Sequence, residues 1–524
     1  MTLPPLRRHV TTRSSALGRR RFVAAALVGL WGCSAQTAHD GPASQGGRAA
    51  GGSGASTGGL TIGGSASMTL DYARCSDGSL TCRKVDCPAD SVPSTTTVSG
   101  FVYDPAGKVP LYNAVVYVVE ESALAPLSHG AQCESCSAHF PQTVTTFALT
   151  EADGSFTLTD VPVGPDIPLV VQIGKWRRKV KIDYVTPCTN NALSVDMTRL
   201  PRNSSEGDLP KIAVTTGKSD ALECLLRRIG VDDSEFTPDT EDGRVNLFWG
   251  FGASKTMQAP SGSKPLTRAE ELWADSSRML EYDMILMSCE GEDNLWNAPT
   301  TNEFPQLAAK GAIERPPDMH LEVRKYADRG GRIFGSHWHH RWINSDASTP
   351  DHPYPDASSP PVATFSSSAQ DVGSVSVSVD TSFPKGKAFH EWLTKQNAFD
   401  DQGLLPLVKA EHSVDFVNGD LARRWIYGTD PKGKPDSSRI PDMVQYFSFT
   451  TPVGNATECG RMVFSDVHVT FGGGSLQSLP FPERCDAEGE LTPQEKALAF
   501  MIFDLSSCIQ KENDEPSSPI PVVK

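Results

Sequence analysis

The chain contains 524 residues, of which 38% are hydrophobic and 21% are charged. This length allows two or three domains, and this composition excludes a wholly disordered protein. No apolar run reaches the ~18 residues of a membrane-spanning helix, so a polytopic membrane protein is excluded too. The formal net charge is −15, and it becomes −21 without the first 33 residues, which carry six Arg and no acidic residue. Such an acidic chain is repelled by phosphate backbones, so we expect no nucleic-acid partner.

The first 33 residues have the pattern of an export signal. Arg19, Arg20 and Arg21 precede an apolar run from Val23 to Trp31, which is too short to span a bilayer. The Arg pair resembles a twin-arginine export signal, and Leu-Trp-Gly-Cys ending at Cys33 resembles a bacterial lipobox. The resemblance implies acylation of Cys33 and attachment to the cell membrane or outer membrane, with an ordinary signal peptide cut nearby as the alternative.

The segments that flank the folded part are predicted to be loosely structured. Residues 34–70 are rich in Gly, Ser and Ala, so we expect a disordered tether with a mean span of roughly 30–35 Å. Residues 71–96 are a Cys-rich segment, and residues 511–524 are expected to be a disordered tail. A tether of this length would hold the folded part of a lipoprotein away from the membrane.

Eleven Cys remain besides Cys33, and export favours disulfides over metal thiolates. Six lie in the first half of the chain and five in the second: Cys75, Cys82, Cys87, Cys133, Cys136 and Cys188, then Cys224, Cys289, Cys459, Cys485 and Cys508. We predict that the bonds form mainly within each half. Because Cys459, Cys485 and Cys508 lie within fifty residues, Cys459 is predicted to pair with one of the other two.

One thiol of the second half is left over by this pairing. Cys224 lies in an apolar helical pattern typical of a buried inert thiol, whereas Cys289 ends a predicted strand and is the more interesting candidate. Cys133-Glu-Ser-Cys136 with His139 offers three zinc ligands, but no fourth stands nearby and the expected compartment is oxidising. Redox chemistry at this pair or at Cys289 is a further alternative, and the pair does not lie at a strand-to-helix turn.

Residues 97–205 show the two-residue alternation of β-strands. The predicted strands are 98–104, 114–119, 145–150, 155–159, 169–173 and 179–183. Asp153-Gly154 lies between two of them and predicts a hairpin, because Gly accepts a positive φ. Short strands at this spacing favour a small antiparallel β-sandwich.

Three motifs stand out in this region. They are Gly100-x-Val102-x-Asp104-x-x-Gly107, Ala114-x-Val116-x-Val118, and Asp153-Gly154-x-Phe156-x-Leu158 with Val161-Pro162-x-Gly164. Together they resemble the carboxypeptidase regulatory-like (transthyretin-like) domain. The resemblance implies a domain without catalytic residues that braces a partner domain or binds carbohydrate or protein. The basic edge Trp176-Arg177-Arg178-Lys179 suits an anionic polysaccharide, although charges on an edge strand also serve to block strand pairing.

From residue 208 to residue 510, predicted strands alternate with predicted helices. Strands are expected at 211–216, 245–249, 282–288, 332–335, 442–449 and 460–465, and helices at 220–229, 268–280, 319–329 and 493–505. Thr492 and Glu495 predict a capping box at the last helix. The alternation favours a multidomain protein in which a doubly wound, flavodoxin-like α/β domain follows the sandwich. The Pro- and Ser-rich stretch 345–368 is expected to be a long loop near the strand tops.

Two segments of this domain end in histidine: Gly330-Gly331-Arg-Ile-Phe-Gly335-Ser-His337 and Gly460-Arg-Met-Val-Phe-Ser-Asp466-Val-His468. They resemble the class I glutamine-amidotransferase-like fold, and its ThuA-like branch in particular. That fold implies an elbow with a nucleophilic Cys near His337, and a catalytic His in the second segment. His337 stands where the Cys would be, and no acidic partner follows His468 closely, so glutamine hydrolysis is not expected. From the lipobox to the closing segments Leu491-Thr-Pro-Gln-Glu-Lys-Ala and Phe503-Asp-Leu-Ser-Ser-Cys508, most of the chain also resembles a group of uncharacterised myxobacterial lipoproteins, a resemblance that gives no information on activity.

Three predicted strands end in polar groups: Ser288-Cys289-Glu290, His337-Trp338-His339-His340 and Asp466-Val467-His468. Ligands of doubly wound sheets bind at the carboxyl ends of strands, so we expect His337, Asp466 and His468 to meet, with Glu290 as a candidate base. Imidazole and carboxylate ligands around an open position suit a Zn²⁺-activated water, so a divalent metal on these three side chains is one hypothesis. Histidines that are merely hydrogen-bonded are the simpler alternative.

The chain contains no Walker phosphate loop, dinucleotide Gly motif, Gly-x-Ser-x-Gly elbow or His-Glu-x-x-His pair. The first hypothesis is therefore an exported, membrane-anchored lipoprotein with a binding or structural role at the cell envelope, where polysaccharide or an envelope protein would be its partner. The alternative is an exported hydrolase or sugar-modifying enzyme that uses the His/Asp/Glu cleft. In that case Trp338 and Trp342 would stack on a sugar ring.

Overall fold

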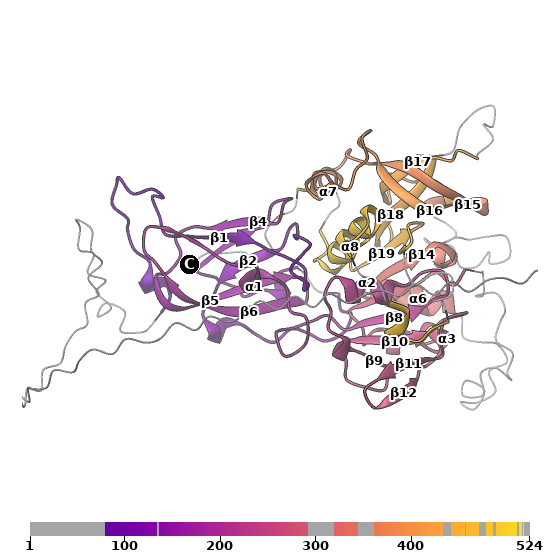
Figure 1. Cartoon of the computed structure of the whole chain (residues 1–524), viewed down its shortest axis with the longest axis horizontal. Coiled ribbons are helices and arrows are strands. Elements are labelled where there is room, and N and C mark those ends of the chain that lie inside the picture. The colour runs from indigo at the N-terminus through magenta and orange to yellow at the C-terminus, as the bar shows by residue number, and fades with distance from the viewer. Residues whose placement is uncertain are drawn as a thin grey trace, which may run out of the picture. The chain divides into compact units, whose positions relative to one another are not determined.

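The structure is a computed structural model of the chain (Figure 1). It describes residues 79–133, 136–291, 319–343, 361–432, 442–455, 457–470, 478–485, 489–510, 513–515 and 517. The predicted export signal, Cys33, the tether and most of the predicted tail lie outside the described residues. The described residues belong to one compact unit, Asp71–Lys524. None of the described helices combines the length and the apolar character needed to cross a membrane.

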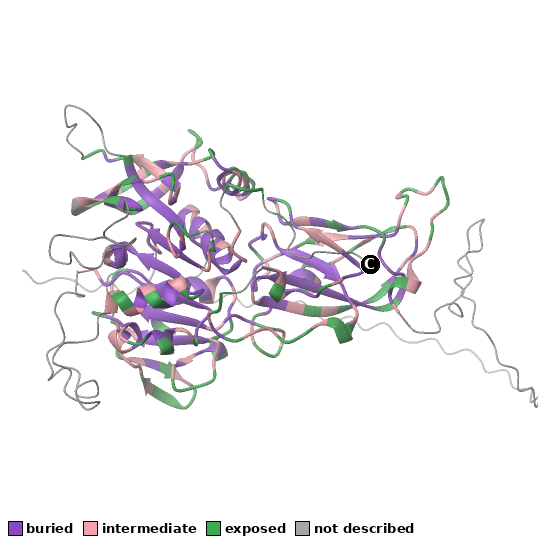
Figure 2. Ribbon diagram, turned by 180° about the vertical axis from the view of Figure 1, so that it is seen from behind, coloured by how far each residue is buried: buried purple, intermediate pink, exposed green. Residues whose placement is uncertain are grey.

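The first part of the described chain consists of two β-sheets. Its strands are β1 (Thr97–Phe101), β2 (Val115–Val118), β3 (Thr146–Leu149), β4 (Ser155–Leu158), β5 (Gly164–Ile173), β6 (Trp176–Val185) and β7 (Asn190–Ala192), followed by the short helix α1 (Val195–Thr198). The sheet orders are β4-β1-β7 and β3-β2-β5-β6. All pairs are antiparallel except β1 and β7. Both faces of β2 are buried (Figure 2), and Tyr117 packs against Phe140 and Val144 on one of them.

The Asp153-Gly154 turn forms, but the strands beside it do not pair. Gly154 has a φ of +80°, and its N–H donates a hydrogen bond to the carbonyl of Glu151. β3 pairs with β2, whereas β4 pairs with β1 in the other sheet. The hairpin prediction is therefore wrong, because turn chemistry is local and does not decide which sheet the next strand joins.

The second part is built on a ten-stranded sheet. Its strands are β8 (Ile212–Thr216), β9 (Phe236–Pro238), β10 (Val245–Trp249), β13 (Met284–Met287), β14 (Arg332–Ser336), β15 (Ala363–Val379), β16 (Leu405–Val417), β17 (Arg423–Thr429), β18 (Asp442–Thr451) and β19 (Gly460–Ser465). The order is β16-β15-β17-β18-β19-β14-β13-β8-β10-β9. The strands from β19 to β9 are parallel. Within them, β10-β8-β13-β14-β19 has the 2-1-3-4-5 order known from doubly wound sheets.

Helices cover this sheet. They are α2 (Leu222–Arg228), α3 (Ala269–Trp273), α4 (Ser276–Met279), α6 (Met319–Asp328), α7 (Pro384–Lys395) and α8 (Pro493–Ser506). Alternate residues of β13, Ile285 and Met287, share one core cluster with Leu272 of α3 and Tyr326 of α6. The predicted capping box of α8 is confirmed. The predicted helix 268–280 is split in two, because the side chain of Asp275 caps α4.

The antiparallel half of the sheet was only partly expected. β18 and β19 were predicted, whereas β15, β16 and β17 were not, and β15 occupies the end of the predicted loop 345–368. β15 and β16 pair through several register shifts. Such bulges interrupt the two-residue alternation on which strand prediction depends. A separate hairpin pairs β11 (Thr256–Ala259) with β12 (Gly262–Pro265).

The sandwich packs directly on the α/β domain. The Trp176 ring lies edge-on to Phe503 of α8, at a centroid distance of 6.0 Å. Trp392 of α7 donates its Nε1–H to the carbonyl of Pro110 (2.8 Å). Gly174 has a φ of +55°, and a Cβ atom there would lie 1.8 Å from the carbonyl oxygen of Ser506, so only glycine allows this approach.

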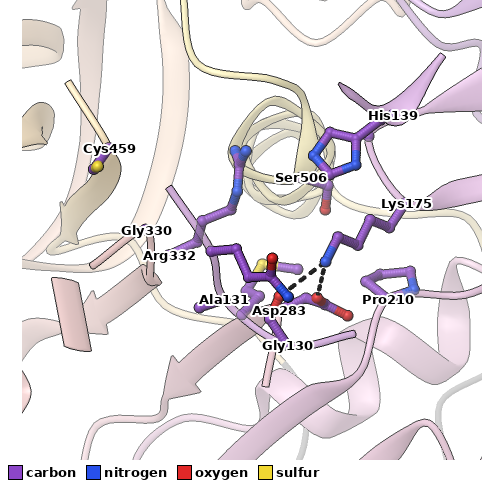
Figure 3. A pocket seen from close by; sticks show the side chains of 13 residues that line it. Gly130, Ala131, His139, Lys175, Pro210, Asp283, Gly330, Arg332, Cys459 and Ser506 are labelled. Carbon is purple, nitrogen blue, oxygen red and sulfur yellow. Dashed lines mark hydrogen bonds and ion pairs between the residues drawn. The ribbon is translucent and has the colours of Figure 1, made fainter. Parts of the chain in front are cut away.

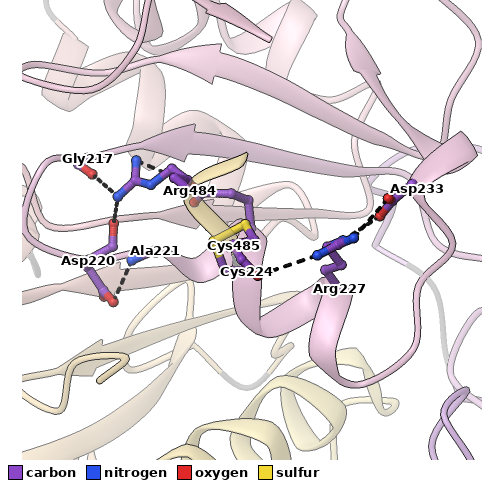
Figure 4. Close-up of a disulfide and its surroundings, with 9 residues drawn as sticks. Gly217, Asp220, Ala221, Cys224, Arg227, Asp233, Arg484 and Cys485 are labelled. Atoms are coloured by element: carbon purple, nitrogen blue, oxygen red, sulfur yellow. Dashed lines mark hydrogen bonds and ion pairs between the residues drawn. A yellow bond between two sulfur atoms is a disulfide. The ribbon is translucent and has the colours of Figure 1, made fainter. Parts of the chain in front are cut away.

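Disulfides tie distant parts of the chain together. The bonds are Cys87–Cys188, Cys133–Cys459 and Cys224–Cys485, the last of which is drawn in Figure 4. Cys87–Cys188 and Cys224–Cys485 each lie within one half, as predicted, whereas Cys133–Cys459 joins the two halves. The predicted pairing of Cys459 with Cys485 or Cys508 is therefore wrong, and Cys224 is not a free thiol. Because Cys133 is bonded to Cys459, the predicted alternatives of zinc or redox chemistry at this Cys are also wrong. Disulfides of this kind indicate a periplasmic or extracellular location.

Candidate functional site

Three neighbouring parallel strands end at one edge of the sheet. β13, β14 and β19 are adjacent, and each is followed within three residues by a side chain able to bind or react: Cys289, His337 and His468. Parallel strands bring their carboxyl ends to the same edge, which is where doubly wound sheets bind ligands. Cys289 is fully buried, and each histidine is only 5% exposed. We call these three residues the Cys–His–His cluster.

His337 occupies a sharp turn at the end of β14. Its φ is +44°, in the left-handed region, which costs a residue with a side chain roughly 1–2 kcal/mol. The 3₁₀-helix His337–Trp342 begins at this residue. Backbone strain that is held in place by the surrounding structure is a common property of functional sites, and here it fixes the position of an imidazole.

Asp220, in the loop after β8, connects two of the strand ends. Its Oδ2 accepts a hydrogen bond from the hydroxyl of Ser336 (2.7 Å), the residue before His337. Its Oδ1 accepts one from the N–H of Val469 (2.9 Å), the residue after His468. Asp220 is therefore a positioning residue for both histidines. Sequence reasoning missed this role, because an Asp before an apolar helical segment is ordinarily a helix cap.

Cys289 contacts His337. Its Sγ lies 3.4 Å from Nδ1 of His337 and accepts a hydrogen bond from the N–H of Gly291 (3.3 Å). Burial raises the pKa of the Cys289 thiol, and the backbone N–H groups of Gly291 and Trp338 oppose this rise. The thiol is therefore neutral at pH 7 in the absence of a bound cation, and a neutral thiol is a weak nucleophile.

The two imidazoles lie side by side with free nitrogen atoms. The ring centroids of His337 and His468 are 5.3 Å apart. Burial lowers the pKa of both rings, so both are neutral at pH 7. The Nε2 atom of each ring is buried and has no hydrogen-bond partner among the described residues. One ligand atom from each member of the Cys–His–His cluster lies within 4.8 Å of the other two, so the cluster could hold a metal ion.

Glu411 of β16 is the acidic side chain beside this cluster. Its Oε2 lies 3.9 Å from Nε2 of His337. Burial raises the pKa of Glu411 to about 7, with contributions from Asp466 and Asp371, while Lys432 opposes the rise. Sequence reasoning missed Glu411 because β16 was not predicted, and its place follows from long-range pairing with β15.

The two predicted carboxylates bind elsewhere. Asp466 is fully buried, and its two oxygens accept hydrogen bonds from the N–H (2.8 Å) and the hydroxyl (2.9 Å) of Ser413. Burial raises the pKa of Asp466 to about 7, and Ser413 opposes the rise. The Oε1 atom of Glu290 accepts a hydrogen bond from the N–H of Phe251 (3.0 Å), in the loop after β10. The structure thus brings His337 and His468 together with a thiol, while Asp466 and Glu290 have other partners.

The remaining residues of the His-rich turn have structural roles. Nε2 of His339 lies 3.0 Å from the carbonyl of Ser288, and its Nδ1 accepts a hydrogen bond from Trp342 (3.0 Å). Trp342 is buried against Trp273 in the core, so it is not available to stack on a sugar, contrary to the prediction. Trp338 is half-buried and contacts the His337 ring.

A small cavity lies where the sandwich meets the α/β domain (Figure 3). Its volume is about 30 Å³, enough for one or two water molecules only. Lys175 spans it, and its Nζ donates to the carbonyl of Gly130 (2.9 Å) and to Oδ1 of Asp283 (2.6 Å). This cavity belongs to the joint between the two parts of the molecule.

Similarity to known proteins is distant. No family model matches the chain, and no curated protein matches it. Among solved structures it is similar to a protein described as ThuA-like from Bacteroides uniformis ATCC 8492, with 12% identity, coverage of 56% of this chain and 89% of that chain, and a TM-score of 0.27. It is also similar to a cytoplasmic protein from Salmonella typhimurium, with 11% identity, coverage of 57% of this chain and 98% of that chain, and a TM-score of 0.27. A type II cohesin–X-dockerin complex from Acetivibrio cellulolyticus matches with 17% identity, coverage of 26% of this chain and 85% of that chain, and a TM-score of 0.15.

Proposed function

We propose that this protein is an exported lipoprotein of the cell envelope whose α/β domain binds a small ligand at the Cys–His–His cluster. The observation that carries the binding role is the pair of buried, unpartnered Nε2 atoms of His337 and His468. An unsatisfied buried polar group costs about 1–3 kcal/mol. A site that keeps two such atoms is therefore suited to a ligand that supplies the missing interactions.

Two features support placement at the envelope. The disulfides suit an oxidising compartment, and Cys224–Cys485 and Cys133–Cys459 close loops of 261 and 326 residues that a reducing cytoplasm would leave open. The N-terminal segment supplies the anchor, through acylation of Cys33 at a lipobox. The Gly- and Ser-rich tether then allows the folded part to reach polysaccharide or a protein of the envelope.

In this proposal the sandwich is a brace of the carboxypeptidase regulatory-like kind. It contributes no residue to the Cys–His–His cluster. Cys133–Cys459 and the ion pair of Lys175 with Asp283 join it to the α/β domain. A covalent and ionic joint of this kind suits a support for the domain that carries the site.

We infer that the α/β domain is amidotransferase-like, of the ThuA-like branch. The inference is supported by the backbone of His337, which directly follows β14 and has the positive φ of a strand–turn elbow. Because this position holds His, glutamine hydrolysis is not part of the proposal.

An exported hydrolase is the second candidate. It is favoured by Glu411, which lies 3.9 Å from His337 and whose pKa of about 7 is suited to a general base at neutral pH. Screening the purified protein against chromogenic esters, amides and glycosides tests this candidate. Turnover that is lost in Glu411→Gln would support it, and the absence of turnover on every class would leave the binding role.

The anchor is tested by membrane fractionation of Cys33→Ala. We expect the parent to partition into detergent and to incorporate labelled fatty acid, and the variant to be released or to remain unprocessed. Cys289→Ala is the matched control, since it removes a Cys that forms no disulfide and should leave anchoring unchanged. Equal membrane retention of Cys33→Ala and the parent would contradict the anchor.

A further inference from the structure

The Cys–His–His cluster combines three features that hydrogen bonding within the protein does not explain. Its thiol and both imidazoles are buried, and the two Nε2 atoms have no hydrogen-bond partner in the part of the chain that the structure describes. Neutral imidazole and thiol groups of this kind are the side chains that soft and borderline transition metals bind. Ca²⁺ and Mg²⁺ prefer sets of oxygen ligands, which this cluster does not offer.

We propose that Cys289, His337 and His468 bind a single Zn²⁺ ion through one thiolate and two imidazoles, with a fourth position left for water or a ligand. This assignment deepens the proposed binding role by naming the chemical class of what is bound. It replaces the predicted ligand Asp466, whose oxygens are both used by Ser413.

The distances are close to those of a zinc site. Zn–S and Zn–N bonds of about 2.3 and 2.0–2.1 Å in a tetrahedron place neighbouring ligand atoms roughly 3.3–3.6 Å apart. Sγ of Cys289 and Nδ1 of His337 are 3.4 Å apart, which lies within this range. The upper limit for the three atoms is 4.8 Å, so His468 needs to approach by at most about 1.5 Å. Side-chain rotation alone supplies movements of this size.

The groups around the cluster suit metal ligation as well. Sγ of Cys289 accepts a hydrogen bond from the N–H of Gly291, which stabilises a thiolate. Zn²⁺ on Nδ1 of His337 would leave Nε2 of that ring to donate to Glu411, whose Oε2 lies 3.9 Å away, while the unpartnered Nε2 of His468 would bind the ion. A backbone hydrogen bond of His468 at Lys409 holds the second ring. Carboxylate–histidine and carbonyl–histidine pairs of this kind orient zinc ligands in metalloproteins.

The local charge also favours a cation. The negative charges of Asp220 and Glu411 both act on Cys289. Asp220 is buried among the loops that carry both histidines. Binding of Zn²⁺ would displace one proton from the thiol to solvent and leave a metal–thiolate unit of net charge +1, which offsets these carboxylates.

The first test is the metal content of the full-length protein purified without chelators. We expect zinc at about one per chain. After removal with a chelator, the apoprotein should take up Co²⁺ and show the near-ultraviolet thiolate-to-cobalt charge-transfer band together with the intense visible bands of tetrahedral Co²⁺. Folding of every sample is checked by circular dichroism.

Variants decide which side chains are the ligands. Cys289→Ser should lose the charge-transfer band, and His468→Ala should lower Co²⁺ affinity by about 100-fold or more. The matched control is His390→Ala, which removes a histidine of α7 that contacts the ring of Phe399 and should keep both signals. The proposal is overturned if folded parent protein binds neither Zn²⁺ nor Co²⁺, if copper is retained in place of zinc, or if Cys289→Ser keeps the band. If the protein is anchored through Cys33 but contains no metal, the zinc site alone is refuted. If the protein contains zinc but is released from the membrane, the anchor alone is refuted.

Discussion

Two buried polar clusters of this molecule differ in whether their polar groups find partners within the protein. The first surrounds Asp504 of α8, whose carboxylate oxygens lie 2.9 Å from Nη1 of Arg461 and 2.9 Å from Nζ of Lys385. Both cations are nearly fully buried. These charges hold the pKa of Asp504 below its usual range in spite of burial. Here each buried charge has an opposite charge within the protein.

The Cys–His–His cluster is the second, and it is left incomplete. Its rings stay neutral because burial lowers the pKa of His337 and His468, and their Nε2 atoms have no hydrogen-bond partner within the described segments. The difference indicates a division of roles. The Asp504 cluster stabilises the fold because its charges pair with one another, whereas the other cluster keeps a thiol and ring nitrogens that are suited to an added species.

Removing Asp504 should have the largest effect on stability. Asp504→Ala leaves Arg461 and Lys385 buried without their carboxylate, which costs about 3–5 kcal/mol in the free energy of unfolding. Urea unfolding followed by tryptophan fluorescence measures the loss. The exposed Asp420→Ala is the control and should change stability by less than about 0.5 kcal/mol. A similar small loss for both variants would show that the Asp504 cluster does not stabilise the fold.

The disulfide beside the strand ends should have the next largest effect. Cys224–Cys485 closes a loop of 261 residues, and Cys224→Ala/Cys485→Ala should lower the free energy of unfolding by about 2–5 kcal/mol under non-reducing conditions. The exposed Asp420→Ala is again the control and should leave stability almost unchanged. Peptide mapping without reduction checks the connectivity directly. Recovery of Cys459 joined to Cys485 would contradict the structure.

Elements with strong local signals were predictable from the sequence. Thr492 and Glu495 marked the start of α8, and the apolar runs that form β18 and β19 were recognised. Each of these depends on a few consecutive residues. The disulfides and the strands β15 to β17 depend on pairing between distant segments, for which one sequence gives no signal.

The candidate site shows the same limit at the scale of single residues. His337 and His468 were expected at neighbouring strand ends, and the parallel order of β14 and β19 places them there. Asp466 was expected on the same side as His468 because residues two apart in a strand share a face. β19 ends at Ser465, so that period does not extend to Asp466. Cys289 joins the cluster because β13 lies next to β14.

Asp104 of the sandwich has partners for one of its two carboxylate oxygens, so it stands between the two clusters. We expect it to make the stability of the fold depend on pH. Its Oδ1 accepts hydrogen bonds from the N–H groups of Lys108 (2.8 Å) and Val109 (3.1 Å), but no described residue donates a hydrogen bond to its Oδ2. Burial raises the pKa of Asp104 to about 7. A raised pKa in the folded state means that the protonated carboxyl stabilises the fold below pH 4, and that this contribution is lost as the pH rises towards 7.

Asp104→Asn should remove this loss, since the amide keeps the Oδ1 acceptor and does not ionise. From pH 5 to pH 8, the parent should lose about 2 kcal/mol more of its free energy of unfolding than the variant. Urea titrations of both proteins at the two pH values give this difference, in which the contributions of all other groups cancel. Parallel curves for parent and variant would refute the assignment of a raised pKa to Asp104.

The smallest predicted effect isolates the backbone strain at the Cys–His–His cluster. His337→Gly and His337→Ala both remove the imidazole, but only glycine adopts a φ of +44° without steric cost. The Gly variant should therefore be more stable than the Ala variant by about 1 kcal/mol. The control position is His339, which is not among the described residues with positive φ. There the order should reverse, and the Gly variant should be less stable than the Ala variant by about 0.5–1 kcal/mol. Thermal unfolding of the four chelator-treated variants measures both differences, and the same order at the two positions would show that the turn at His337 stores no strain.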